Sequence, residues 1–199
     1  QVDAEELAKR LKVNFETIPI KKLFDGFENT LNNSKDFKLK GIANENIQSR
    51  IRGTLLMALA NQNNHLLLST GNKSELAVGY CTLYGDMNGG LSVIGDLYKT
   101  NVFKLCKWLD SKQSYQSKKN YDLPKTGELI GKNIYSKPPS AELGPNQLDT
   151  DTLPPYDILD DILKGIIEEK KDFNQLKEKG YTKDLIEKIL KLIKKSEFK

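Results

Sequence analysis

The spacing of apolar residues predicts alternating helices and strands over the first half of the chain. Apolar side chains recur every three or four positions, as in amphipathic helices, over 3–11, 20–32, 44–62, 73–80 and 99–109. Short apolar runs predict strands at 13–20 and 66–68, with a brief extended piece at 91–94.

The chain changes character at about residue 112. Segment 112–137 is rich in Ser, Lys, Gln, Asn, Pro and Gly and shows no apolar period, so we expect a flexible loop there. Two proline pairs, at 138–139 and 154–155, bracket a segment that can be neither central strand nor helix interior. Helices are then predicted at 156–168 and 182–194, with a short turn at 172–178 between them and Thr182 as the N-cap of the last helix.

Strands that alternate with helices, followed by helices alone, indicate an α/β fold. We expect a parallel sheet flanked by helices, with a helical C-terminal extension. Two clear strands do not make a stable sheet, so the chain is expected to be the later part of a larger α/β unit.

Composition narrows the possible functions. The net charge is +4 and the basic residues form no stripe with interleaved aromatics, so no nucleic-acid partner is expected. No apolar run reaches transmembrane length, so no membrane partner is expected either, and a cytoplasmic location is the default. Cys81 and Cys106 lack metal-ligand spacing, and His65 is the only histidine, which argues against Ser/His or Cys/His catalysis.

The segment around residue 70 carries candidate chemistry. A short apolar run ends in Ser69, Thr70 and Gly71, and a predicted helix follows with Glu75 in its first turn. Ligands of open α/β sheets bind where strands lead into helices, and a helix N-terminus suits phosphate. Glu75 lies close enough to hold a Mg²⁺ ion that bridges phosphate oxygens. Many such turns bind nothing, and these residues alone leave both interpretations open.

Four segments together resemble NAD synthetase, in wording closest to the synthetase domain of the glutamine-dependent form. They are 46–52 (NIQSRIR), 69–75 (STGNKSE), 80–90 (YCTLYGDMNGG) and 137–143 (KPPSAEL), and segments 147–149 (QLD) and 153–156 (LPPY) also fit. The resemblance runs over nearly the whole chain. It implies a Rossmann-like, adenine nucleotide alpha hydrolase-like fold.

The resemblance also implies a reaction. Members of this family amidate deamido-NAD to NAD: the carboxylate is adenylated by ATP, pyrophosphate leaves, and ammonia, free or from glutamine, displaces AMP. Such chemistry depends on positioning and charge stabilisation, with Mg²⁺ offsetting charge on the leaving group. A homodimer or higher oligomer is expected.

Site residues follow from the resemblance position by position. ATP-binding positions correspond to Thr70, Lys99 and Ser140. Deamido-NAD-binding positions correspond to Asn46, Arg50, Glu75 and Lys199, and Glu75 also corresponds to the acid assigned to Mg²⁺ in one branch of the family. No side chain is assigned as a catalytic acid or base. Outside the resemblance, surface charge, helix capping or turn formation would account for each of these residues.

Some family features have no counterpart between residues 1 and 199. The Ser-Gly-Gly-x-Asp-Ser ATP loop is absent, so we expect an N-terminally incomplete synthetase domain with doubtful activity alone. The glutaminase domain is absent as well, and a longer parent chain could supply it. Two alternatives stay open: another adenylating amide ligase of the superfamily, and a non-catalytic oligomerisation or binding module of the same fold.

Overall fold

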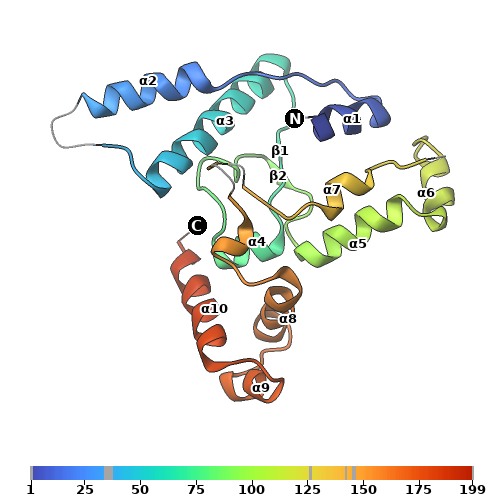
Figure 1. Cartoon of the computed structure of the whole chain (residues 1–199). Coiled ribbons are helices and arrows are strands. Elements are labelled where there is room, and N and C mark those ends of the chain that lie inside the picture. Colours follow the sequence, from blue (N-terminus) through green and yellow to red (C-terminus); the bar gives the residue numbers. More distant parts are fainter. Residues whose placement is uncertain (1, 34–37, 126, 142, 145–146, 199) are drawn as a thin grey trace.

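A two-stranded parallel sheet lies near the middle of the computed structural model, which describes residues 2–33, 38–125, 127–141, 143–144 and 147–198 (Figure 1). Strand β1 (Leu68–Ser69) pairs with β2 (Leu91–Ser92), with Leu68 opposite Leu91. Because the strands are parallel, their carboxyl ends lie at one edge of the sheet, where α/β folds bind ligands.

Three helices precede the sheet along the chain, and all three were predicted. They are α1 (Val2–Leu11), α2 (Lys21–Asn32) and α3 (Ile42–Asn63). The predicted strand at 13–20 is wrong, because this segment joins α1 to α2 without regular structure. Val13 and Phe15 stay 56% and 43% exposed, and no described strand offers this segment a hydrogen-bonding partner. An apolar run without a neighbouring strand has nothing to pair with.

A helix follows each strand, as predicted: α4 (Lys73–Val78) after β1 and α5 (Lys99–Leu109) after β2. Segment 112–137 is not structureless, because it contains the 3₁₀ turn η1 (Lys112–Ser114) and the short helices α6 (Tyr115–Asn120) and α7 (Lys132–Ser136). Hydrogen bonds from the backbone of residues 129–131 to Asp110 order part of this segment. Such bonds cannot be predicted from the spacing of apolar residues. The flexibility of this segment stays a prediction.

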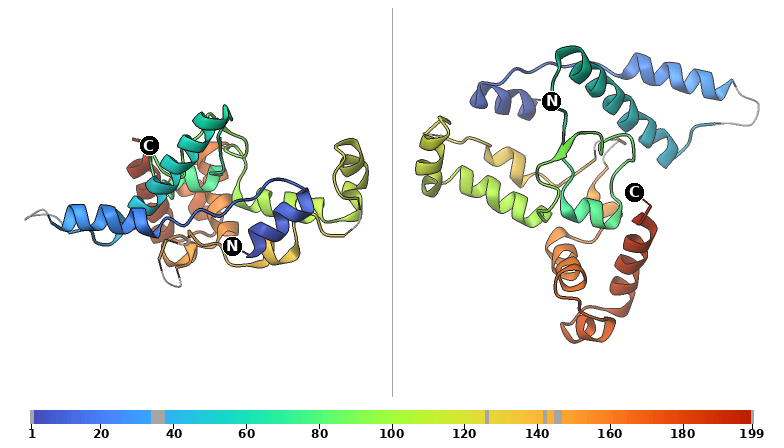
Figure 2. Two further views of the ribbon diagram at one scale, coloured as in Figure 1. Left: turned by 90° about the horizontal axis from the view of Figure 1, so that it is seen from above. Right: turned by 180° about the vertical axis from the view of Figure 1, so that it is seen from behind.

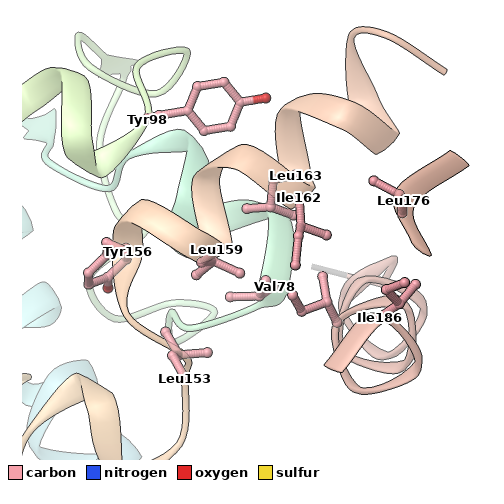
Figure 3. Packing of buried hydrophobic residues seen from close by; sticks show 10 residues of the cluster. Val78, Tyr98, Leu153, Tyr156, Leu159, Ile162, Leu163, Leu176 and Ile186 are labelled. Carbon is pink, nitrogen blue, oxygen red and sulfur yellow. The ribbon is translucent and has the colours of Figure 1, made fainter. Parts of the chain in front are cut away.

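A hydrophobic core lies among the C-terminal helices. After the turn η2 (Asp149–Asp151), the chain forms α8 (Tyr156–Ile167), α9 (Phe173–Glu178) and α10 (Lys183–Ser196). Thr182 accepts a hydrogen bond from Leu185 N, which confirms the predicted cap. Apolar side chains from α8, α9 and α10 pack together with Val78 of α4 (Figure 3). Six of them are 0–2% exposed: Leu159, Ile162, Leu163, Leu176, Ile186 and Ile189.

The arrangement places the short helix α4 between two larger parts. Seen from the front and from behind, α1–α3 lie on one side of the sheet and α8–α10 lie beyond α4 on the other (Figures 1 and 2). Both α8 and α10 contact α4, so the C-terminal core holds the helix that follows β1. The predicted parallel sheet with flanking helices and a helical C-terminal extension is therefore confirmed. No helix within the described residues is long and apolar enough to cross a membrane.

Candidate nucleotide site

A cavity of about 460 Å³ opens where β1 leads into α4. Its walls come from α3, from residues 67–71, and from the two segments around 80–88 and 140–149. Four residues predicted to bind ATP or deamido-NAD line it: Thr70, Glu75, Lys99 and Ser140. A concave site where a few polar groups converge is the usual form of a small-molecule site.

Glu75 and Lys99 form an ion pair in the cavity wall. Lys99 Nζ lies 2.7 Å from Glu75 Oε1, and the two side chains are only 19% and 18% exposed. The ammonium group also lies 5.4 Å from the centre of the Tyr156 ring and 5.9 Å from that of Phe103, within range of cation–π attraction. A half-buried pair is screened by salt less than a surface pair. The wall therefore offers a cation for a phosphate and a carboxylate for a metal ion.

The N-terminus of α4 is closed by groups of the protein itself. Asn72 Oδ1 accepts a hydrogen bond from Glu75 N at 3.1 Å, and Glu75 Oε2 accepts one from Asn72 N at 3.3 Å, which together form a capping box. Lys73 N donates to Leu97 O at 2.9 Å. The N–H groups of Asn72, Lys73 and Glu75 are therefore already bonded within the protein, and the binding of a phosphate at this helix start stays a prediction.

Behind Lys99, Tyr156 and Asp149 form a buried polar pair. The Tyr156 hydroxyl donates to Asp149 Oδ2 at 2.7 Å, and the two residues are 7% and 3% exposed. Burial raises the pKa of Tyr156, and the hydrogen bond to Asp149 raises it further. Burial and the Asp149 carboxylate also raise the pKa of Tyr80, another residue of the cavity wall. Both phenols are therefore neutral near pH 7.

The segment that carries Ser140 is fastened to α3. Ser140 Oγ donates to the Gln147 carbonyl. Gln147 Nε2 in turn donates to Glu45 of α3 at 3.2 Å, and Gln48 Nε2 of α3 donates to the Leu143 carbonyl at 3.0 Å. These bonds hold Ser140 at the cavity wall.

Asn46 and Arg50, predicted to bind deamido-NAD, do not line the cavity but hold a loop that does. Thr82 Oγ1 donates to Asn46 Oδ1 at 2.8 Å, and Arg50 Nε donates to the Leu83 carbonyl at 3.2 Å. Asp86, in the same loop, faces the cavity and accepts a hydrogen bond from Thr82 N at 2.8 Å. Direct contact of Asn46 and Arg50 with a ligand stays a prediction.

Among the wall residues that were not predicted as site residues are the acidic residues Asp86 and Asp149. Both lie in segments that carried the resemblance, around 80–90 and 147–149, but their spacing alone gives them no role. Asp86 N donates to Ser49 Oγ of α3 at 3.0 Å, a contact between positions 37 apart that no local pattern records. Lys199, also predicted to bind deamido-NAD, lies outside the described residues.

A family model described as NAD synthase matches residues 1–199. The chain belongs to the NAD synthase family. The predicted resemblance is therefore confirmed. The chain is 50% identical to a glutamine-dependent NAD(+) synthetase of Synechocystis sp. and 43% identical to one of Thermotoga maritima, in each case over 99% of its own length. It spans 33% and 32% of these relatives, about a third of each.

Solved structures of NAD and NMN synthetases resemble this fold. A glutamine-dependent NAD+ synthetase from Acinetobacter baumannii in complex with ADP matches with a TM-score of 0.59 and 38% identity, over 96% of this chain and 32% of that one. The NMN synthetase from Francisella tularensis matches with a TM-score of 0.72 and 27% identity, over 99% of this chain and 68% of that one.

Proposed function

We propose that this chain is the synthetase part of an enzyme that uses ATP to amidate deamido-NAD to NAD. One observation carries the proposal: in a chain of the NAD synthase family, the Lys99–Glu75 ion pair lies with Thr70 in a cavity at the end of β1. The relative from Acinetobacter baumannii, solved with ADP, supports a nucleotide as one ligand.

In the first step, a carboxylate oxygen of the nicotinate ring attacks the α-phosphorus of ATP. A bond forms between this oxygen and phosphorus, the bond to pyrophosphate breaks, and an acyl adenylate results. Negative charge gathers on the departing pyrophosphate, and the Lys99 ammonium is placed to offset it. Thr70 and Ser140 offer hydroxyl groups that orient the nucleotide.

Glu75 fits the role of a ligand for Mg²⁺. Within the described residues, no three acidic, histidine or cysteine side chains gather at one point. Mg²⁺ bound with ATP needs only one or two protein carboxylates besides phosphate and water oxygens, and Glu75 supplies one. Its Oε2 accepts a 3.3 Å hydrogen bond from Asn72 N, longer than the 2.7 Å contact of Oε1 with Lys99, so Oε2 is the more available oxygen. When bound, the ion would offset phosphate charge during pyrophosphate release.

In the second step, ammonia attacks the activated carbonyl carbon. The bond to AMP breaks, the nitrogen loses a proton, and the amide of NAD forms. Because AMP is a good leaving group, this step needs orientation more than a strong base. Ammonia could arrive free or from a glutaminase domain elsewhere in the protein, as the names of the relatives suggest.

The loop from Thr82 to Asp86 is proposed to meet the deamido-NAD. Asn46 and Arg50 support this loop from α3, and Asp86 is one of the residues that line the cavity. A homodimer is also proposed. Helix α2 buries none of its residues, and its Phe27 is 48% exposed, so an apolar face is available for a second copy. Sedimentation of the complete protein at the size of a monomer would contradict the dimer.

The test uses the complete protein that contains this chain. It is supplied with ATP, Mg²⁺ and ammonium, and either deamido-NAD or the corresponding mononucleotide acid. We expect NAD and AMP to form in equal amounts. Preference for the mononucleotide would favour the second candidate, an NMN synthetase, which the likeness to the Francisella tularensis protein suggests. Calorimetry that finds no heat with ATP–Mg²⁺ or with either acid would indicate a non-catalytic module.

A further inference from the structure

Two adjacent residues of α4 bind Lys99, one at its backbone N–H and the other at its side-chain ammonium. Ser74 Oγ accepts a hydrogen bond from the Lys99 backbone N–H at 2.8 Å, while Glu75 Oε1 lies 2.7 Å from Lys99 Nζ. Ser74 is completely buried, at 0% exposure, and lies on the side of α4 that faces α5 and α8. The position of the ammonium group therefore depends on the backbone contact as well as on the ion pair.

Asp160 of α8 completes this arrangement from a third helix. Its Oδ1 accepts the hydroxyl proton of Ser74, and its Oδ2 accepts a hydrogen bond from Thr100 N at 2.8 Å. A serine hydroxyl has one proton and two lone pairs. Because the Ser74 hydroxyl donates its hydrogen bond to Asp160, a lone pair of the Ser74 oxygen can accept the hydrogen bond from the Lys99 N–H. Asp160 is 5% exposed, so water does not compete well for these bonds.

Helix α5 has no cap of its own that could replace these bonds. Its N-cap residue, Tyr98, makes no side-chain capping hydrogen bond. The first N–H groups of the helix, those of Lys99 and Thr100, are bonded instead by Ser74 and Asp160. A carboxylate at a helix N-terminus is favourable, because it meets the positive end of the helix dipole. The start of α5 is thus fixed by α4 and α8 together.

We infer that Asp160 is a positioning residue for the nucleotide site: through Ser74 it fixes the start of α5 and so aligns Lys99 with Glu75. The inference rests on the proposed function, because it assigns the Lys99 ammonium to the phosphates of ATP. Asp160 does not line the cavity, so it is not proposed to touch a ligand. Its effect reaches the ligand only through the Lys99–Glu75 pair.

The neighbouring residue supplies a matched control. Asp161 is the next residue of α8, but its carboxylate binds Lys179 at 2.8 Å and the Tyr181 hydroxyl, away from α5. Asp160→Asn and Asp161→Asn therefore remove the same charge from the same helix. In the complete protein, Asp160→Asn should raise the KM for ATP about tenfold, the effect of losing a hydrogen bond to a charged group. Its KM for deamido-NAD should change less than about twofold, and Asp161→Asn should alter neither value.

A double-mutant cycle separates positioning from general damage. If Asp160 acts through the ion pair, adding Asp160→Asn to Glu75→Gln should raise the KM for ATP much less than it does in the parent protein. Asp161→Asn should leave the KM for ATP unchanged in both backgrounds. Full additivity of Asp160→Asn and Glu75→Gln, or an unchanged KM for ATP in Asp160→Asn, would overturn the inference.

Hydrogen exchange tests the geometry without any substrate. The N–H groups of Lys99 and Thr100 should exchange faster in Asp160→Asn than in the parent protein and in Asp161→Asn. Unchanged exchange of these N–H groups in Asp160→Asn would contradict the positioning role of Asp160 but not the proposed function. Conversely, a parent protein that binds ATP but forms no NAD would contradict the proposed function, and ATP binding of the two variants by calorimetry would still decide the positioning role.

Discussion

The Lys99 ammonium and the Glu75 carboxylate lie 2.7 Å apart, although the two residues are 24 positions apart in the chain and belong to different helices. The same glutamate closes the capping box of α4 with Asn72. The Glu75 side chain therefore has two roles, an ion pair with Lys99 at the cavity and a cap at the start of α4. A substitution that removes its charge but keeps a capping side chain can separate the two roles.

Replacing Glu75 by Gln should lower NAD formation about a hundredfold, as expected when a charged group that stabilises the reacting phosphates is lost. Glutamine also serves at this position of a capping box, so the thermal midpoint should stay within a few degrees. Steady-state rates and thermal unfolding measure the two effects. Glu168→Gln, which weakens an exposed ion pair with Lys73, is the control. Normal turnover in Glu75→Gln would remove Glu75 from the site.

Much of the fold follows from the spacing of apolar residues. This spacing located α3, α5, α8 and α10 within a few residues. It works best for α8 and α10, which are amphipathic and bury apolar side chains in the C-terminal core, whereas α5 buries none of its residues. The same rule failed at residues 13–20, where apolar residues meet no partner strand. It also gave no sign of the short helices between 112 and 137, where bonds to Asp110, a residue before the segment, order one part of it.

The residues of the candidate site also fall into two groups, those predicted from the sequence and those found only in the structure. Thr70, Glu75, Lys99 and Ser140 were found through the family resemblance, and the cavity brings all four together. Asp149 and Asp160 could not be assigned from sequence, because their roles come from Tyr156 and from the start of α5, which only the folded chain brings beside them. Residues proposed to bind a ligand can be recognised from sequence motifs. The role of a residue that positions another can be recognised only from the tertiary contacts between them.

Arg50→Ala should raise the KM for deamido-NAD more than the KM for ATP. Its Nε holds the Leu83 carbonyl at 3.2 Å, in the loop that presents Asp86 to the cavity, while Thr70 and Lys99 lie on other segments. Losing one hydrogen bond from a charged donor should cost about tenfold in the affected constant. Initial rates with each substrate varied in turn give both values, and an equal rise in the two would refute the assignment.

Gly53→Ala should disturb the same loop, also from α3. A β-carbon at Gly53 would lie 2.5 Å from Asn88 Nδ2 and 2.8 Å from the Gly85 carbonyl oxygen, so the loop would have to move away from α3. We expect a loss of about 1–3 kcal/mol in unfolding free energy, together with weaker binding of deamido-NAD.

Gly26→Ala is its matched control in α2. A β-carbon there meets nothing within 4 Å, so alanine should stabilise the helix by roughly 0.5–1 kcal/mol. Denaturant titration of both variants measures the pair. Equal stability changes in the two would contradict the close contact between α3 and the loop.

Asp110 should make stability depend on pH in the acid range. Burial works against its charged form, but hydrogen bonds from the backbone N–H groups of Leu129, Ile130 and Gly131, at 2.7–2.8 Å, outweigh it and lower the pKa of Asp110. A lowered pKa in the folded state means stabilisation above the ordinary value of about 3.9, lost as the pH falls below it.

Asp110→Asn isolates this contribution, because an amide cannot accept all three hydrogen bonds as the carboxylate does. The variant should be about 2 kcal/mol less stable than the parent protein at pH 7. The difference should shrink as the pH falls from about 5 to 3, because the parent protein then loses the charge that the variant never had. Denaturant unfolding of both proteins at several pH values measures this. A difference that stays constant over that range would show that the charge of Asp110 is not what holds segment 129–131.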